Sequence, residues 1–178
     1  MRLLFVYVLG VAYVSIAQAE VRSVCEILTK LPEYSGKVVS VRGRIGYGGR
    51  VEAEDCDLKI HVGEFDFPNV IAIEWADSDL VARARLALPF EMDVKSRDRF
   101  NNAANATSGR NARMYATVEG LLVTRQPPLQ LVLKKNPTVR YGFGHLAQAP
   151  ALIVVKQVSD FELSRERDDG TRERIPFP

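Results

Sequence analysis

The sequence predicts a mainly β protein: a five-stranded OB-like Greek-key barrel with an N-terminal helix and a helix between strands 3 and 4. Several short segments alternate apolar and polar residues, as strands with one buried face do. After the third of these segments the apolar spacing changes to that of a helix. The resulting order of strand, strand, strand, helix, strand, strand matches this barrel, although other small barrels could share it.

The segment at residues 1–19, "MRLLFVYVLGVAYVSIAQA", predicts a secretory signal peptide. A basic residue at position 2 precedes an apolar stretch, and Ala17 and Ala19 have the spacing of a cleavage site. The apolar stretch at 3–17 is too short for an ordinary membrane span, which needs about 20 residues. We therefore expect cleavage after Ala19, a secreted or periplasmic location, and no membrane span in the mature chain.

Charge and length suggest one ordinary globular domain. The chain has 178 residues, and its 24 Lys and Arg residues nearly balance its 22 Asp and Glu residues. This balance argues against the overall electrostatics of a dedicated nucleic-acid-binding protein. A chain of this length can bury a core without a dense set of disulfides. We expect a single barrel domain over residues 20–163, present as a monomer.

Both cysteines, Cys25 and Cys56, follow the signal peptide. Neither lies in a C-x-x-C motif or beside a histidine, so redox catalysis and zinc binding are poor alternatives. In an oxidising compartment, pairing is the default. We therefore predict a structural disulfide between Cys25 and Cys56.

The segment "SVCEILTKLP" (23–32) predicts a short amphipathic helix before the first strand. Ser23 and Glu26 have the spacing of a capping box, and Pro32 ends the helix. The apolar residues repeat at helical spacing, which places Cys25 on the buried side.

Two strands are predicted next, at 38–45 ("VVSVRGRI") and 58–62 ("LKIHV"), with a turn at "GYGGR" between them. Gly43 falls among the buried positions of the first strand, which predicts a bend or a close backbone approach. The polar side chains expected to point outward from these strands are Ser40, Arg42, Arg44, Lys59 and His61.

A third strand is predicted at 70–75 ("VIAIEW") and a helix at 77–88, capped by Asp77 or Ser78. Residues 96–112 contain few apolar side chains and predict a flexible connection.

The C-terminal part of the chain predicts two long strands, at 114–125 and 151–163, and a short extra strand at 129–135. The tail, 164–178, is rich in charges of both signs and predicts disorder.

Two stretches resemble a group of uncharacterised secreted bacterial proteins. They are "SVCEILTKLPEYSGKVVSVRGRI", followed about ten residues later by a cysteine, and "YGFGHLAQAPALIVVKQVSDFEL". The resemblance covers most of the mature chain except 96–112 and the tail. The group is generally described as OB-like and has no assigned activity, so the resemblance implies a fold and a compartment and no site.

No catalytic motif stands out. The sequence contains no H-E-x-x-H, no G-x-S-x-G and no phosphate-binding G-x-x-x-x-G-K-[ST] motif. We expect a non-enzymatic binding or interaction module without metal or cofactor, whose partner is an unknown protein or an anionic ligand. One enzymatic alternative is a hydrolase in which His61 and His145 converge in one pocket.

A basic barrel face is one candidate ligand-binding surface. Single-strand-binding proteins combine positive charge with outward aromatic rings. Here the charge is present, but nearby rings are mostly missing, so a solvated strand face is the simpler interpretation. Binding of single-stranded nucleic acid or another polyanion is possible but not favoured. Its candidate residues are Arg42, Arg44, Tyr47, Lys59 and His61.

The segment "YGFGHLAQAP" (141–150) is the other candidate. Its glycines allow the chain to fold back and lay aromatic rings over an open end of the barrel. We interpret it as a turn that covers the core. The alternative places Tyr141, Phe143 and His145 at the rim where OB barrels receive ligands.

Overall fold

The computed structural model describes residues 20–54, 56, 58, 60–62, 65–107, 112–124, 142–144, 149–167 and 169–177, with the backbone alone for 60–62, 65 and 66. The expected signal peptide and the expected short strand at 129–135 lie outside these residues.

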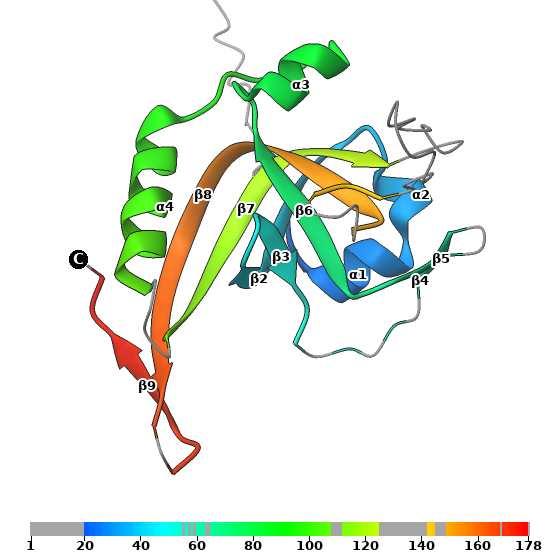
Figure 1. Cartoon of the computed structure of the whole chain (residues 1–178). Helices are drawn as coiled ribbons and strands as arrows, with labels where there is room; N and C mark the ends of the chain where they lie inside the picture. Colours follow the sequence, from blue (N-terminus) through cyan, green and yellow to red (C-terminus); the bar gives the residue numbers. More distant parts are fainter. Residues whose placement is uncertain are drawn as a thin grey trace, which may run out of the picture.

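Five strands form a closed barrel (Figure 1). They are β2 (Val38–Gly46), β3 (Arg50–Glu52), β6 (Val70–Trp75), β7 (Ala112–Thr124) and β8 (Ala151–Glu166). The strand order is β2-β3-β6-β8-β7, and pairing of β7 with β2 closes the ring. The β6–β8 pair is parallel and the other four pairs are antiparallel. The predicted class, a mainly β protein with a five-stranded barrel, is confirmed.

The second strand of the barrel is not the predicted one. Its place is taken by β3, only three residues long, in a stretch where the sequence predicts turns. The expected strand at 58–62 instead provides β4 (Ile60–Val62), which pairs with β5 (Phe65–Phe67) in a separate two-stranded sheet. The reason is length: β3 contributes a single interior residue, Val51, so it gives no readable alternation.

The N-terminal segment fills one end of the barrel. Strand β1 (Val21–Ser23) pairs in parallel with β2, and α1 (Val24–Thr29) and α2 (Leu31–Tyr34) follow. The Ser23 hydroxyl accepts a hydrogen bond from the Glu26 amide at 3.1 Å, as the capping pattern predicts. Val24, Ile27 and Leu28 of α1 are buried in the main core with the inward residues of all five barrel strands.

Gly43 permits this close approach of α1 to the barrel wall. A Cβ atom built at Gly43 would lie 2.9 Å from Val24 Cγ2 and 2.9 Å from the Glu52 carbonyl oxygen. A side chain therefore has no room between β2, β3 and α1. The predicted close backbone approach at this position is confirmed.

A second apolar cluster covers the outside of β6 and β8. Val70 and Ala72 on β6 and Leu152 and Val154 on β8 alternate with the residues that point into the barrel. Val81 of α3 (Asp79–Ala84) packs on this cluster, and Ser78 caps α3 as predicted. The helix is shorter than the predicted 77–88 because Arg85 adopts a left-handed conformation that ends it.

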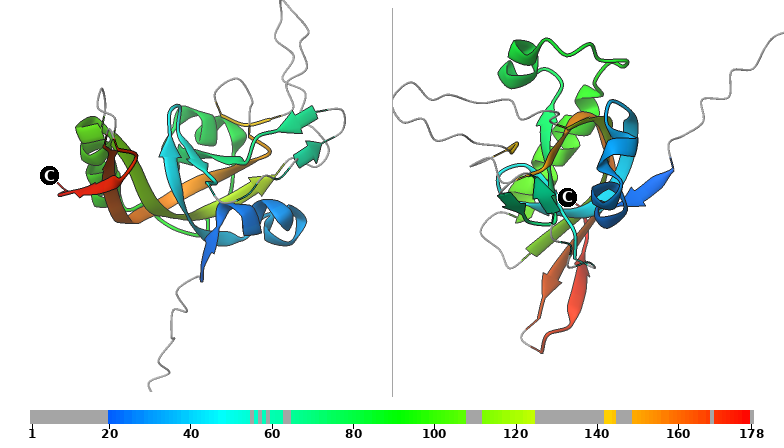
Figure 2. Two further views of the ribbon diagram at one scale, coloured as in Figure 1. Left: turned by 90° about the horizontal axis from the view of Figure 1, so that it is seen from below. Right: turned by 90° about the vertical axis from the view of Figure 1, so that its right-hand side faces the viewer.

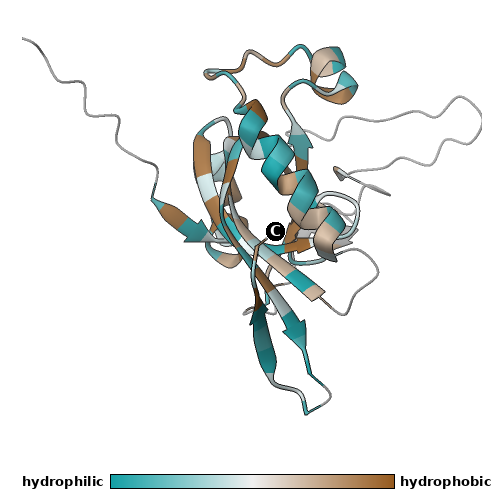
Figure 3. Ribbon diagram, turned by 90° about the vertical axis from the view of Figure 1, so that its left-hand side faces the viewer, coloured by the Kyte–Doolittle hydropathy of each residue, from teal (hydrophilic) through white to brown (hydrophobic). Residues whose placement is uncertain are grey.

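The prediction of a flexible connection at 96–112 is wrong over 96–107, because the chain forms helix α4 (Val94–Thr107) there. Asp93 accepts a hydrogen bond from the Ser96 amide, and Phe100 packs edge-on against Trp75 with ring centroids 5.6 Å apart. Figure 3 shows how much of α4 is hydrophilic, and Figure 1 shows it lying along β8. Contacts with the barrel, more than apolar content, stabilise this helix.

The prediction of a disordered tail at 164–178 is also wrong for the residues that the structure describes. Strand β8 continues to Glu166, and β9 (Arg172–Ile175) pairs with it in a hairpin that projects from the barrel (Figure 2). Ile175 packs on the cluster that contains Met114 and Leu163. The ribbon is mostly charged and exposed, and Ile175 and Phe177 anchor it, with the Phe177 ring centroid 5.3 Å from that of Phe161.

A hydrogen bond to Ser96 joins α4 to β8 close to a shift in the β7–β8 register. The fully buried Ser96 hydroxyl accepts this bond from the Val158 amide at 2.5 Å. Ser96→Ala leaves that amide buried without an acceptor, so we expect a loss of about 1–3 kcal/mol in the free energy of unfolding. Asn102→Ala, at an exposed position of α4, is the control, with a change within about 0.5 kcal/mol. Urea denaturation measures both, and equal stability of the two variants would contradict this role.

The predicted disulfide between Cys25 and Cys56 is confirmed, with a Cα–Cα distance of 6.1 Å and a sequence separation of 31. On the chain-entropy model, closing a loop of this size stabilises the protein by about 3–4 kcal/mol. We expect the Cys25→Ser/Cys56→Ser double variant to unfold at correspondingly lower denaturant, with α1 still docked through its buried apolar residues. Non-reducing peptide mapping should recover the two cysteines linked, and two alkylatable thiols in the native protein would refute the assignment.

Candidate functional site

A polar cleft opens in the barrel wall beside β2. On one edge, β2 pairs with β1 at residues 40–42 and with β3 at 44–46, which leaves a gap near Gly43. The gap widens into a cleft of about 350 Å³. Its polar lining comes from Arg22, Arg42, Arg44, Glu52, Glu54 and Tyr115.

Glu52 forms the buried wall of the cleft. Glu52 is 7% exposed. Its carboxylate pairs with Arg50 Nε at 2.5 Å and with Arg44, which lies directly opposite on β2. A carboxylate at this depth needs compensating positive charge, and the two guanidinium groups provide it. Arg44 is therefore held in the wall by a partner on the neighbouring strand.

Glu54 connects three separate parts of the chain. Its carboxylate accepts hydrogen bonds from Tyr115 Oη at 2.5 Å, Arg113 at 3.2 Å and Arg172 at 3.3 Å. Arg44 Nε lies 3.5 Å away as a further ion-pair partner. The loop after β3, the start of β7 and the β9 hairpin therefore meet at one carboxylate.

The environment of Glu54 shifts two pKa values in opposite directions. Burial opposes ionisation of Glu54, but the Tyr115 hydrogen bond and the nearby arginines outweigh it and hold the pKa below its ordinary value. Burial raises the pKa of Tyr115, and its bond to the Glu54 carboxylate raises it further. The pair is thus an ionised carboxylate and a neutral phenol at neutral pH.

Arg42 also lines the cleft. Its guanidinium donates to Glu162 at 3.1 Å and to the Asp160 carbonyl at 2.9 Å, and its side chain is 37% exposed. These bonds to the described part of the chain occupy two of its five N–H donors. The remaining donors give the cleft a capacity to bind an anionic group.

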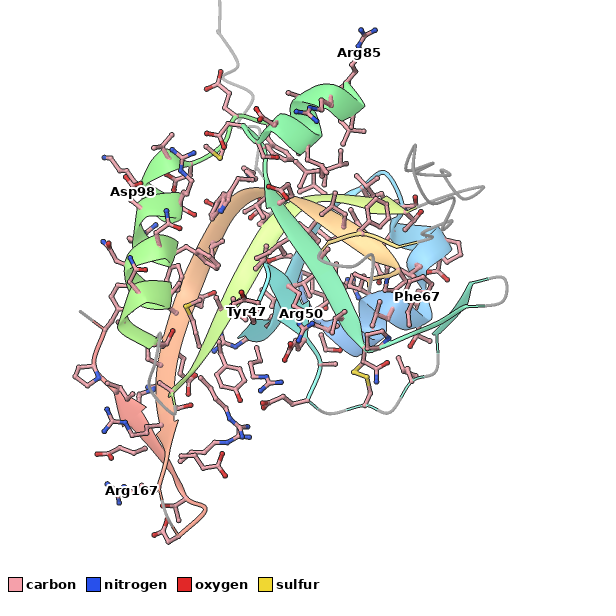
Figure 4. All side chains as sticks on the ribbon, viewed as in Figure 1. Tyr47, Arg50, Phe67, Arg85, Asp98 and Arg167 are labelled. Atoms are coloured by element: carbon pink, nitrogen blue, oxygen red, sulfur yellow. A yellow bond between two sulfur atoms is a disulfide. The ribbon has the colours of Figure 1, made fainter. Side chains whose placement is uncertain are left out.

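The structure brings together two of the predicted ligand-binding residues, Arg42 and Arg44. Tyr47 lies apart from them on the turn between β2 and β3, with 90% of its surface exposed (Figure 4). Lys59, Tyr141 and His145 lie outside the described residues, and His61 is described only by its backbone in β4. Convergence of His61 and His145 therefore stays a prediction.

Phe143 packs on the outer apolar cluster of β6 and β8. Its amide and carbonyl pair with those of Ala149 at 2.8 and 3.1 Å, which closes a loop. A Cβ built at Gly144 would lie 3.1 Å from Ala72 Cβ, so the backbone lies directly on the barrel wall. The described part of the 141–150 segment covers the outside of the barrel, whereas the sequence suggested its open end.

Sequence reasoning missed Glu52, Glu54 and Tyr115, which line the cleft, and also Arg113 and Arg172, which bond to Glu54 beside it. Each is ordinary in its own segment, and only the pairing of β2 with β3 and β7, and of β8 with β9, brings them together. The alternation in "RMYATVEG" places Arg113 and Tyr115 on one strand face, which is the one signal available beforehand.

Comparison with known protein families, with curated proteins and with solved structures finds no match. The resemblance to secreted OB-like proteins therefore stays a prediction. Among the described residues, no helix is long and apolar enough to cross a membrane. The same part of the chain contains no cluster of three His, Cys, Asp or Glu side chains arranged to hold a metal ion.

The low pKa of Glu54 predicts acid sensitivity. The ionised Glu54 carboxylate stabilises the folded state fully above the ordinary pKa of 4.5. This stabilisation is lost as the pH falls through the lower pKa that Glu54 has in the folded state. We expect Glu54→Gln to be less stable than the wild type at pH 7, with the difference closing towards low pH. Glu33→Gln, on the exposed surface of α2, is the control. Denaturant midpoints from pH 7 to pH 3 measure this, and a constant difference across the range would contradict it.

Proposed function

We propose that the protein is an exported, non-enzymatic binding module that binds an anionic group of its partner in the cleft beside β2. The observation that carries this proposal is that the partly exposed side chains of Arg42 and Arg44 line one hollow, with donors to spare on Arg42. Tyr115, whose hydroxyl is bonded to Glu54, gives the hollow an aromatic wall.

An OB-fold assignment of the barrel supports a binding role. The first strand pairs with the second and fourth, the third pairs in parallel with the fifth, and helices lie between the third and the fourth. We propose that this connectivity is that of an OB-fold, a fold that often serves binding. Fold alone does not determine function, so the proposed binding role rests on the cleft.

Export is the second part of the proposal. A disulfide is compatible with an extracellular or periplasmic location, where such bonds persist. The predicted signal peptide at 1–19 supplies the route, and the two features are independent of each other.

A small anionic group fits this cleft better than a polyanion. Every arginine at or beside the cleft pairs with a glutamate of the same chain: Arg22, Arg42, Arg44, Arg50, Arg113, Arg172 and Arg174. A polyanion would have to displace several of these carboxylates, whereas one ligand group can use the free donors of Arg42. The outer face of β6 is apolar and is packed against α3 and Phe143, so it offers no basic path for a nucleic-acid backbone.

Titration with a short, end-blocked peptide that carries one glutamate tests the proposal. We expect saturable binding that weakens with salt, and about tenfold weaker binding by Arg42→Ala, because a charge-assisted hydrogen bond contributes about 1.5–3 kcal/mol. Arg83→Ala, exposed on α3, removes the same charge elsewhere and should bind like the wild type.

Two results would count against this assignment. Absence of binding of the single-glutamate peptide at low salt would remove the anion site, and equal weakening by both arginine variants would reduce it to a general charge effect. Tight retention on single-stranded DNA with a steep salt dependence would instead favour the polyanion alternative.

A further inference from the structure

A second hollow, separate from the cleft, lies where the β2–β3 turn faces α4. It has a volume of about 420 Å³, within the range of about 300–1,000 Å³ that is typical of small-molecule sites. Ile45, Phe100 and Met114 provide its apolar surface, and Ala104 and Thr107 line it from α4. Ile45 and Arg44 are neighbours on opposite faces of β2, so this groove and the polar cleft open on different sides of the strand.

The described lining of the groove is uncharged. None of its described lining residues is an Asp, Glu, Lys or Arg, although these make up 26% of the chain. Glu52 lies against Gly46 at the edge of the groove, but its carboxylate is paired with Arg44 and Arg50. A charged ligand would lose its hydration here without gaining an opposite charge from these residues, so the described lining selects a neutral ligand.

Polar groups of the lining are few and neutral. The Thr107 hydroxyl hydrogen is directed to the carbonyl oxygens of Ala103 and Ala104, at 3.2 and 3.0 Å, so its oxygen can still accept a hydrogen bond. This number of polar groups is too small for a sugar, which presents hydroxyls on all sides. It suits a mainly apolar compound with one hydroxyl or amine.

Tyr47 provides an aromatic surface at the rim. An exposed ring indicates little by itself, but this one borders an apolar hollow and lies between glycines, where Gly48 and Gly49 have φ values of 78° and 70°. Glycine at these positions lets the turn adopt a conformation that other residues avoid. The ring can therefore stack on a compound that occupies the groove.

We propose that this groove binds an uncharged, mainly apolar ring compound, held between Phe100 and Met114 below and Tyr47 at the rim. The site does not depend on the anion site of the cleft. Its occupant differs in charge, and none of its lining residues belongs to the cleft.

The neutral two-ring dye N-phenyl-1-naphthylamine is the probe for this site. We expect its fluorescence to rise with a single saturable phase on addition of the purified protein. Trp75, the one tryptophan of the chain, packs on Phe100 and should transfer excitation energy to the bound dye. The anionic analogue anilinonaphthalene sulfonate should bind at least tenfold more weakly.

Two substitutions on α4 and one on the turn locate the site. Ala104→Phe fills the groove and should weaken dye binding at least tenfold, while Asn105→Phe, at the next and exposed position, should leave it within twofold. Tyr47→Ala removes an exposed ring without disturbing the core, and we expect a loss of about threefold to tenfold. Thermal melting checks that each variant is folded.

Three results would overturn the proposal: no saturable dye signal in the wild type, unchanged binding by Ala104→Phe, or tighter binding of the anionic analogue. Binding that Tyr47→Ala leaves unchanged would overturn the stacking role of the rim. Absence of single-glutamate peptide binding while dye binding persists, or the reverse, separates failure of the cleft proposal from failure of this one.

Discussion

Closure of the barrel depends on how the two edges of β2 are paired. One edge pairs with β7 over residues 38–45, and the other pairs with β1 and β3. Because β1 and β3 meet different halves of that edge, the sheet remains closed while a gap opens near Gly43. The helix α1 enters the barrel beside this gap, and the polar cleft lies over it. One strand thus determines the closed core and the position of the candidate site.

The long strands β7 and β8 extend the same arrangement beyond the barrel. Their pairing shifts register twice, and such shifts bend a strand pair. Helix α4 packs against this bent region, with Phe100 contacting Trp75 and Ser96 bonded to the Val158 amide. Past the helix the pair continues into the β9 hairpin, whose Arg172 reaches back to Glu54. The far end of the molecule is therefore connected to the cleft by an ion pair.

Much of the fold could be predicted from the sequence, because alternation and helix caps are local signals. The strands at 38–45, 70–75 and 151–163, the cap at Ser23 and the disulfide follow from residues near one another or from compartment. The elements that were missed lack such a signal. Strand β3 has one inward residue, α4 has a polar composition, and β9 consists mainly of charged residues.

The candidate site was less accessible to sequence reasoning. Arg42 and Arg44 could be placed on the outer face of a strand, but their partners are fixed by pairing between distant segments. Glu162 lies 120 positions after Arg42 in the chain, and Arg172 lies 118 positions after Glu54. No local pattern contains this information, since the same residues would fit a solvated surface.

The parallel pairing of β6 with β8 has a consequence for how the protein acquires its structure. Residues 72–75 are held by residues 152–155, so one wall of the barrel cannot form until almost the whole chain is present. Contacts this distant in sequence slow folding because a long loop must be closed first. A chain that crosses a membrane from its N-terminus would emerge with the edge of β6 unpaired and would depend on its last long strand to protect it.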